Sequence, residues 1–464
     1  MNEHSRVLER DELEIAELRS PDVDLRLPAV VPREPFPIEP LTVDARQQTR
    51  AVGQRATRPD GRLHGLGQTK YIDDLSFPGM LYARIKRAGI ASARIKHIDT
   101  SAAETMPGVM AVLIGKEIPT NSFGPTFQDQ PVLADPIVRH AGDGVAAVAA
   151  VTEQIANEAL AKIVVEYEPL PAVLDPVAAM REDSPQVHAP NSNIYATKVV
   201  RKGNIEKGFA ESDRIFEARF STQMIEHVSL EPHAAIADWD ANGRLTIWAT
   251  IGRITLARSD IARTLKLPMS RIRIIGTIVG GNFGGKNEIS QEPTLALLSK
   301  KTGRPVKGVF TRGEEFIATT TRHPIIMDYK TGVSNKGRIL ARQIRLVLDG
   351  GAYCSWSATT LGKACILSPG PYKIDNVLAE AFVVYTNKTM TGAMRGFGAP
   401  QVCFAYESQM DDIAKALGID PLEIRLLNAF DEGSSSPTGQ VLHSVVIKES
   451  LRKAADRFGW EPRS

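Results

Sequence analysis

The chain contains 464 residues, enough for two or three domains with sizeable cores. Its formal net charge is only +2, so bulk electrostatics give no support for a nucleic acid or a membrane surface as a partner. No apolar run approaches the ~20 residues that a membrane-spanning helix needs.

Three cysteines, Cys354, Cys365 and Cys403, include no Cys-x-x-Cys pair. This spacing argues against a disulfide framework and excludes an iron–sulfur cluster bound by this chain alone. The first twenty residues are charged throughout and lack the apolar segment of a signal peptide. We therefore expect a cytoplasmic protein.

Residues 1–50 are rich in Pro, Arg, Glu and Asp and show no apolar periodicity. They are predicted to form an extended arm, with a tail of no function as the alternative. Residues 51–180 contain short apolar runs between turn signals, together with a helical pattern at 152–162 that Thr152 would cap. This order of strand, helix and strand predicts a compact α+β domain.

Residues 187–204 are predicted to be a linker into a second domain, which would cover 181–464. Strand-like runs open that domain, and a helical pattern occupies 399–418. The chain ends on an amphipathic pattern at 449–464 that also predicts a helix.

A glycine-rich loop at 278–288, IVGGNFGGKNE, follows a β-branched run and precedes a helical pattern. From Gly280 it reads G-x-x-x-x-G-K, as in a phosphate-binding loop. The residue after that lysine should be Ser or Thr to ligate magnesium, but it is Asn287. Asp349 is the candidate second acidic ligand. A P-loop NTPase is one alternative, and a turn where two chain segments pack closely is another.

A second glycine-rich loop at 391–401, TGAMRGFGAPQ, also lies between a strand-like run and a helical pattern. Each loop carries one cation, Lys286 or Arg395, and one phenylalanine between glycines, Phe283 or Phe397. Backbone N–H groups in such loops can bind oxygens where no side chain would fit. The two loops therefore suggest a shared anionic or polar ligand.

VGGNFGGK and MRGFGAPQ resemble the two signature loops of the xanthine dehydrogenase and aldehyde oxidase family of molybdenum hydroxylases. GQTKYIDDLSFPGMLYARI is similar to the start of that family's α/β hammerhead domain, and residues 227–240 resemble its strand entering the first molybdopterin-binding domain. The resemblance covers residues 55–460. It implies an α+β fold, with a hammerhead domain followed by a molybdopterin-binding mixed α+β domain.

The resemblance implies a molybdopterin cofactor with molybdenum, in its cytosine dinucleotide form. It also implies hydroxylation of an electron-poor carbon with water as the oxygen source. Phe283, Arg395 and Gly252 would lie near molybdenum oxygens through backbone or indirect contacts. The residues implied to bind the cofactor are Gly280, Gly281, Phe283, Gly284, Gly285, Arg395, Gly396 and Gln401.

Three residues are implied to bind the substrate. Asn287 stands where relatives often have a purine-binding glutamate, and Lys363 lies near a position that is often arginine. Phe397 would stack on a flat ring. A lysine and an amide suit a substrate with a carboxylate or carbonyl group. At Gly252, relatives commonly place a glutamine, so that contact would be missing or supplied by water.

The family's second molybdopterin domain carries the general-base glutamate in a Gly-Glu-Gly segment, which this sequence lacks. The chain is therefore expected to be a fragment or a subunit of a divided enzyme. The implied partners are a second molybdopterin-domain subunit with that glutamate, a 2Fe-2S subunit and an FAD subunit, and the substrate is a small N-heteroaromatic compound such as a pyridine carboxylate or a purine.

Other functions stay open. An aldehyde oxidoreductase or an aromatic acyl-CoA reductase of the same family is one alternative, and a non-catalytic scaffold subunit is another. His227 and His233 are six residues apart, unlike a zinc pair on a helix, and are predicted to be structural.

Overall fold

The computed structural model describes residues 56–461. Residues 56–68 belong to one unit and contain the short helix α2 (Gly61–Gly65), and the residues from Thr69 onward form another. The predicted arm over 1–50 lies outside the described residues. None of the described helices is long and apolar enough to cross a membrane.

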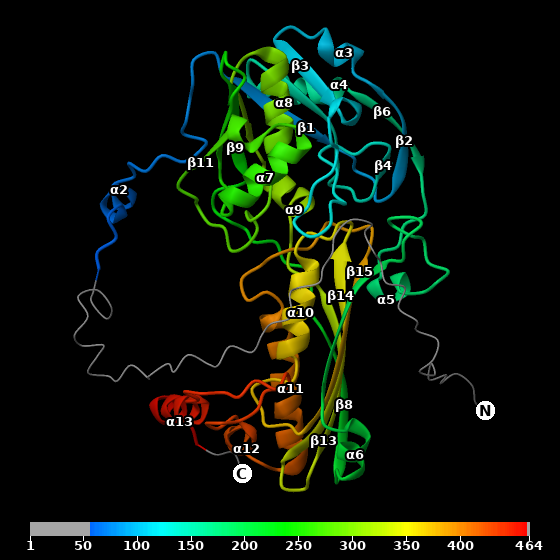
Figure 1. Cartoon of the computed structure of the whole chain (residues 1–464), viewed down its shortest axis with the longest axis vertical. Helices are drawn as coiled ribbons and strands as arrows, with labels where there is room; N and C mark the ends of the chain where they lie inside the picture. The colour runs from blue at the N-terminus through cyan, green and yellow to red at the C-terminus, as the bar shows by residue number, and fades with distance from the viewer. Residues whose placement is uncertain (1–55, 462–464) are drawn as a thin grey trace. The chain divides into compact units, whose positions relative to one another are not determined.

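A seven-stranded mixed sheet forms the core of one half of the larger unit (Figure 1), in the order β11-β10-β9-β12-β1-β5-β3. Its strands are β1 (Leu81–Arg87), β3 (Val109–Ile114), β5 (Gly144–Ala150), β9 (Ala234–Trp239), β10 (Leu245–Ala249), β11 (Ile272–Gly276) and β12 (Val306–Val309). Strand β1 pairs in parallel with β12, so that Leu81 lies opposite Val306. The sheet therefore continues across the predicted boundary at residue 180.

Helices and a small sheet cover this core. Helix α4 is capped as predicted, because the Thr152 hydroxyl accepts a hydrogen bond of 3.2 Å from the Ile155 amide. The helical elements of this half are α3 (Ser101–Glu104), η1 (Gly115–Glu117), α4 (Glu153–Lys162), α7 (Ile254–Thr264), η2 (Met269–Arg271), α8 (Glu292–Thr302) and α9 (Arg312–Ala318). The small sheet has the order β4-β2-β6, with β2 (Ala93–Asp99), β4 (Ile137–Val138) and β6 (Val164–Pro169).

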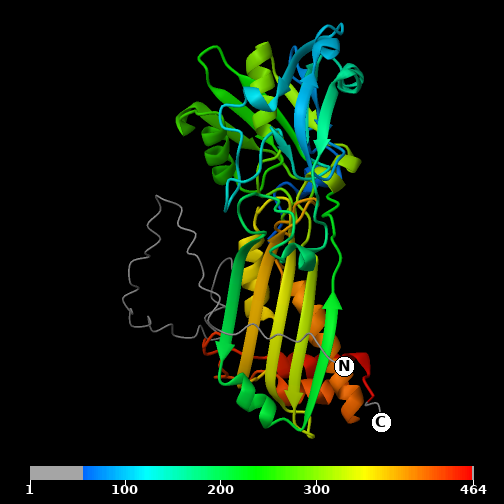
Figure 2. The same cartoon turned by 90° about the vertical axis from the view of Figure 1, so that its right-hand side faces the viewer.

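A five-stranded sheet forms the other half (Figure 2), in the order β7-β15-β14-β13-β8. Its strands are β7 (Ile194–Lys202), β8 (Arg214–Ser221), β13 (Ile325–Val333), β14 (Ile339–Gly351) and β15 (Asn376–Tyr385). Helices α10 (Ser357–Leu367) and α11 (Ala399–Leu417) pack against it. Helices α5 (Pro176–Ala179) and α6 (Ile205–Ala210) lie at its ends (Figure 1). The predicted α+β class is confirmed.

The prediction of a linker at 187–204 is wrong. Nine of these residues form β7, which pairs with β15 at the edge of the sheet. An edge strand often carries charged side chains, which protect it from further pairing. In β7 only Val200 is buried, so the strand lacks the apolar alternation that would reveal it in the sequence.

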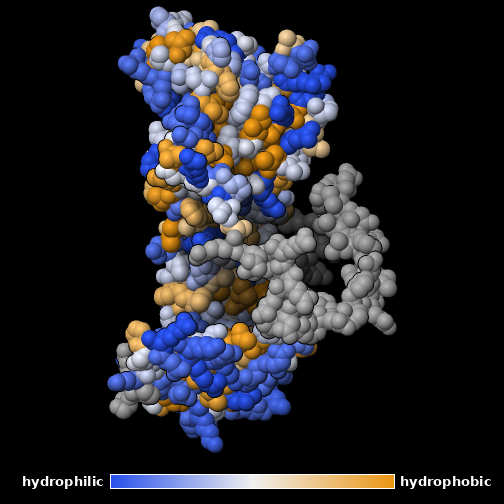
Figure 3. Space-filling view, turned by 90° about the vertical axis from the view of Figure 1, so that its left-hand side faces the viewer, coloured by the Kyte–Doolittle hydropathy of each residue, from blue (hydrophilic) through white to orange (hydrophobic). Residues whose placement is uncertain are grey.

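The chain closes with α12 (Pro421–Asn428) and α13 (Ile447–Phe458). The predicted C-terminal helix therefore starts slightly earlier than residue 449. In Figure 3 the lower end of the molecule is mainly hydrophilic, and more hydrophobic residues lie in the middle of the view.

The topology brings several loops to one edge. Strands β14 and β15 run in parallel, with Gly351 opposite Tyr385 at their carboxyl ends. Helix α10 starts just after β14, and the loop at 391–401 follows β15, so both begin at this edge. The loop at 278–288 follows β11 of the other sheet and meets the loop at 391–401 through a backbone hydrogen bond.

Candidate functional site

The loop at 278–288 is organised by the side chain of Asn282. Its Oδ1 accepts hydrogen bonds from the amides of Gly284 (2.9 Å) and Lys286 (3.1 Å). Gly281 and Gly284 have φ values of +106° and +111°, and Phe283 between them has φ of +49°. A bulky residue rarely adopts positive φ, and such strain is a feature of functional sites.

The loop at 391–401 repeats this conformation. Phe397 has φ of +55° and lies between Gly396 and Gly398, which have φ values of +95° and +91°. The Phe397 amide donates to the Met394 carbonyl at 2.8 Å. The two phenylalanines that the sequence singled out therefore share the same unusual backbone geometry.

The two loops are joined directly. The Arg395 amide donates a hydrogen bond of 2.8 Å to the Phe283 carbonyl. A Cβ added at Gly284 would lie 2.4 Å from the Ala393 carbonyl oxygen, so only glycine permits this approach. The two predicted loops thus form one continuous surface.

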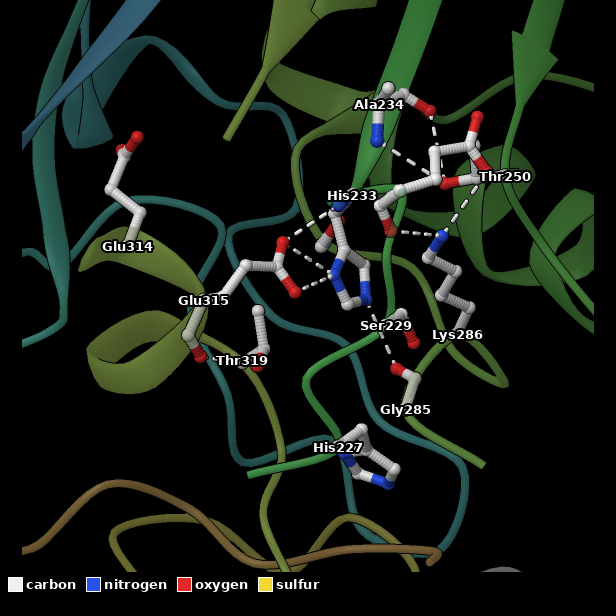
Figure 4. Close-up of polar contacts among 12 residues, drawn as sticks. His227, Ser229, His233, Ala234, Thr250, Gly285, Lys286, Glu314, Glu315 and Thr319 are labelled. Atoms are coloured by element: carbon white, nitrogen blue, oxygen red, sulfur yellow. Dashed lines mark hydrogen bonds and ion pairs between the residues drawn. The ribbon is translucent and has the colours of Figure 1, made fainter. Parts of the chain in front are cut away.

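Two buried histidines donate hydrogen bonds to backbone carbonyls of the loops. The His227 Nε2–H donates to the Ala393 carbonyl at 2.8 Å, and the His233 Nε2–H donates to the Gly285 carbonyl at 3.1 Å. Figure 4 shows His233 between Gly285 and Glu315. Both histidines therefore have the structural role that was predicted for them.

Glu315 sets the charge of His233. Its carboxylate accepts from the His233 backbone amide at 2.7 Å and contacts Nδ1 at 3.0 and 3.1 Å. Burial lowers the pKa of His233, but the hydrogen bond and negative charge of Glu315 outweigh it, and the pKa lies above its ordinary value. A protonated His233 donates from both ring nitrogens, to Glu315 and to Gly285.

Lys286 is buried and paired within the protein. Its side chain is 1% exposed, and Nζ donates to the Glu231 carbonyl at 2.7 Å and pairs with the Glu231 carboxylate at 3.3 Å. The same carboxylate accepts from the Gly280 amide at 2.7 Å. Glu231 and Lys286 therefore brace the loop, and this lysine cannot serve as a phosphate ligand.

The carboxylate of Asp349 is also bonded within the protein. Its buried carboxylate accepts from the Thr386 hydroxyl at 2.6 Å and pairs with Lys388 at 2.9 Å. It lies in β14, where residues 346–351 are all buried. With Lys286 and Asp349 both engaged, the P-loop NTPase alternative is wrong.

The loops retain free backbone donors. In residues 56–461, no protein acceptor contacts the amides of Gly281, Asn282 and Phe283, or that of Gly396 on the other loop. The Arg395 amide, in contrast, is used by Phe283. Adjacent N–H groups without acceptors fit the oxygen atoms of a molybdopterin cofactor.

Gly252 lies against the first loop. Its amide donates to the Lys286 carbonyl at 2.8 Å. A Cβ added here would lie 2.2 Å from Asn282 Nδ2 and 3.1 Å from Asn287 Oδ1. The Asn282 carboxamide therefore fills the space that a longer side chain at 252 would need, and its Nδ2 donates to Asn287 at 3.4 Å.

The remaining predicted residues differ in their placement. Gln401 is buried and bonded to Arg322 Nη1 (3.3 Å) and to the His323 carbonyl (3.2 Å). Arg322 also donates to the Arg395 carbonyl at 2.9 Å, so Gln401 acts on the second loop through Arg322. Lys363 is exposed on α10, and no polar contact links it to either loop in the described chain.

Glu288 is a third acidic residue of the site that was not predicted, besides Glu231 and Glu315. Glu288 is buried beside Asn287, and its Oε1 accepts from the Ser355 hydroxyl at 2.5 Å, while Oε2 has no partner in the described chain. Burial raises the pKa of Glu288 to about 7, against the opposing effect of the Ser355 hydrogen bond. Glu231, Glu315 and Glu288 carry no motif, since each acts through partners distant in the sequence.

Comparison with known proteins identifies both halves of the chain. Residues 66–171 match the α/β hammerhead domain of aldehyde oxidase and xanthine dehydrogenase, and residues 187–429 match the molybdopterin cofactor-binding domain. The chain is 40% identical to the nicotinate dehydrogenase large molybdopterin subunit of Eubacterium barkeri, over 88% of this chain and 96% of that protein. It is 38% identical to a probable xanthine dehydrogenase subunit of Bacillus subtilis, over 88% of this chain but only 56% of that protein.

Solved structures show the same fold. The aldehyde oxidoreductase of Desulfovibrio gigas matches with a TM-score of 0.85 and 30% identity, over 90% of this chain and 47% of that one. Quinoline 2-oxidoreductase from Pseudomonas putida 86 matches with a TM-score of 0.83 and 29% identity, over 88% and 54%. The chain thus spans about half the length of these proteins.

These matches confirm the predicted order of a hammerhead domain followed by a molybdopterin-binding domain. The relatives are oxidoreductases, and the two glycine loops lie within the molybdopterin-binding match. The chain belongs to the xanthine dehydrogenase and aldehyde oxidase family of molybdenum-dependent oxidoreductases.

Proposed function

We propose that this chain is the molybdopterin-binding subunit of a divided hydroxylase that acts on an N-heteroaromatic substrate. Of the two substrate classes, we favour a pyridine carboxylate over a purine. The observation that carries this proposal is the joined pair of loops, in which the Arg395 amide bonds to Phe283 and neighbouring amides stay free. When bound there, the cofactor would supply oxygen transfer from water to an electron-poor carbon and accept two electrons.

The residues of this chain would hold the cofactor and orient it. The amides of Gly281 and Phe283 on one loop and of Gly396 on the other would donate to its oxygens. Gly280, Gly284, Gly285, Arg395 and Gln401 would shape the surface, and Gly252 would leave room for Asn282. We propose the cytosine dinucleotide form.

Asn287 and Phe397 would contact the substrate. An amide can donate to or accept from a ring nitrogen or a carbonyl group, and Phe397 offers an aromatic face. The similarity to a nicotinate dehydrogenase subunit supports a pyridine carboxylate. Lys363, the third predicted substrate contact, lies exposed on α10.

The general-base glutamate would come from a second molybdopterin-domain subunit, and 2Fe-2S and FAD subunits would carry electrons away. The support is the unequal coverage: the chain matches 96% of one relative but 56% of another. The three unpaired cysteines support a reducing, cytoplasmic location. Domain boundaries at residues 50 and 180 are likewise a proposal. The second is supported by the matched segments, which end at residue 171 and begin again at residue 187.

The test is an assay of the complex purified after co-expression with these partners. Molybdenum and pterin content would be measured, and turnover compared for pyridine-3-carboxylate, xanthine and benzaldehyde with a dye as the electron acceptor. We expect full metal content and turnover of the pyridine carboxylate. Asn287→Glu should lower that turnover at least ~10-fold, since it sets a negative charge beside an anionic substrate.

Asn242→Glu, in the exposed turn between β9 and β10, is the matched control and should change nothing. Little molybdenum in the wild-type complex would contradict the proposal and favour a non-catalytic scaffold subunit. Full metal with turnover of benzaldehyde alone would instead indicate an aldehyde oxidoreductase.

A further inference from the structure

A groove of about 630 Å³ opens beside the proposed substrate residue Asn287, where helices α7 and α10 begin. It is lined by residues 252–256, Ser259 and Trp356. Its size suits a small ligand. Gly252 connects it to the loop at 278–288, because a Cβ at Gly252 would lie 3.1 Å from Asn287 Oδ1.

Arg253 brings an uncompensated positive charge to this groove. Its guanidinium carbon lies 4.6 Å from the centre of the Trp356 ring. In the described chain no carboxylate pairs with Arg253, whereas Lys286 of the adjoining loop is paired with Glu231. A guanidinium held over an aromatic ring by a cation–π contact can still present N–H donors, and their fork geometry matches a carboxylate.

Trp356 also carries a hydrogen-bond donor without a partner among residues 56–461. Its indole Nε1 is buried and has no hydrogen-bond acceptor in the described chain, although a buried indole N–H ordinarily finds one. Helix α7 also starts here without a side-chain cap, since Arg253 stands at its N-cap. The groove therefore combines a charged donor and the positive end of an eleven-residue helix, with no negative charge among its lining residues. The buried indole N–H of one lining residue, Trp356, is also unpaired in the described chain.

We infer that this groove binds the carboxylate of an aromatic acid, with Arg253 as the anionic anchor and Trp356 as the platform that holds it. The ring of such a ligand would then extend past Gly252 toward Asn287. The identity of the acid as the enzyme's substrate rests on the proposed function, but binding of the carboxylate does not. Lys363 is the competing anchor, on the same side of α10 as Trp356 but seven residues further on, about 10 Å along the helix.

The test compares two ligands of nearly equal shape, pyridine-3-carboxylate and its uncharged amide, pyridine-3-carboxamide. Their dissociation constants would be measured by calorimetry on the purified complex, without turnover. Arg253→Met should weaken binding of the carboxylate at least ~10-fold and leave binding of the amide unchanged. Arg253→Lys should recover part of the loss, because it restores charge without the fork.

Arg258→Met is the matched control, since Arg258 lies on the same helix but donates to the Met269 carbonyl. It should bind both ligands as the wild type does. Equal weakening of both ligands by Arg253→Met would show that Arg253 only shapes the fold. Loss of carboxylate binding in Lys363→Met but not in Arg253→Met would move the anchor to α10, and either result overturns the inference.

The two proposals fail in different ways. Unchanged binding of the carboxylate by Arg253→Met would overturn the inference, while full molybdenum content and turnover of the pyridine carboxylate would still support the proposed function. A complex that binds the acid through Arg253 but lacks molybdenum would keep the inference and overturn the proposed function.

Discussion

The Arg395 amide donates a hydrogen bond of 2.8 Å to the carbonyl of Phe283. This bond joins two loops that follow strands of different sheets. His227 and His233 bond to the same two loops, at Ala393 and Gly285. The free amides are therefore held in place before any ligand binds, which lowers the entropic cost of binding.

Gly284→Ala should separate the two loops. The new methyl group would lie 2.4 Å from the Ala393 carbonyl oxygen, and φ of +111° is unfavourable for alanine. We expect a loss of about 2–4 kcal/mol in the free energy of unfolding, from the steric clash and the backbone strain together. Thermal unfolding and molybdenum content of the complex would measure it.

Gly362→Ala is the matched control for that variant. Gly362 lies within α10, and an added Cβ would meet nothing within 4 Å. Alanine should therefore stabilise the helix by up to about 1 kcal/mol. If both variants behaved alike, close packing of the loops would not explain Gly284.

Gly252→Ala and Asn282→Gly should be strongly coupled. A methyl group at 252 would displace the Asn282 carboxamide and break its bonds to the Gly284 and Lys286 amides. Each single variant should lose about 1–3 kcal/mol. In the double variant the clash is absent, so its loss should match that of Asn282→Gly alone. Additive losses in a double-mutant cycle would contradict this account.

Glu315→Gln should remove a pH dependence of stability. Because the pKa of His233 is raised in the folded state, its contribution is complete below about pH 6.5 and is lost as the pH rises through the folded pKa. We expect the wild type to lose stability as the pH rises above about 6.5, and Glu315→Gln to lose less. Glu432→Gln, in an exposed pair with His443, should leave the wild-type slope intact in melting curves.

Glu288→Gln should change stability in a pH-dependent way. Burial raises the pKa of Glu288 to about 7, so the folded state holds a proton that the unfolded state loses near pH 4.5. Folding therefore becomes less favourable as the pH rises from about 4.5 to 7, by about 2–3 kcal/mol in all. Glutamine has no such loss, and the variant should gain on the wild type across this range. A constant difference in Tm from pH 4.5 to pH 8 would rule out this titration.

The sequence indicated those parts of the site that are formed by residues close together in the chain. Two loops with phenylalanine between glycines were visible because positive φ restricts residue choice at each position. The partners of those loops were not visible. His233 and Glu315 are 82 residues apart, and Lys286 and Glu231 are 55 residues apart. Lys286 illustrates the difficulty, because its motif suggested a phosphate and only the fold shows its buried carboxylate.

The edge strand β7 was missed for a related reason. Its charged side chains face solvent and not a core, so its sequence pattern resembles that of a linker. The groove at Arg253 was also hidden, since residues 253 and 356 come together only when α7 and α10 pack near the same loop.

The pairing of β1 with β12 has a consequence during protein synthesis. Leu81 meets Val306, so the ribosome must make more than two hundred further residues before β1 receives its parallel neighbour. Until then β1 can pair only with β5, and its other edge stays open, which invites pairing with other nascent chains. Completion of the seven-stranded sheet thus waits for β12, and a truncation before residue 309 should yield an aggregating product instead of an isolated hammerhead.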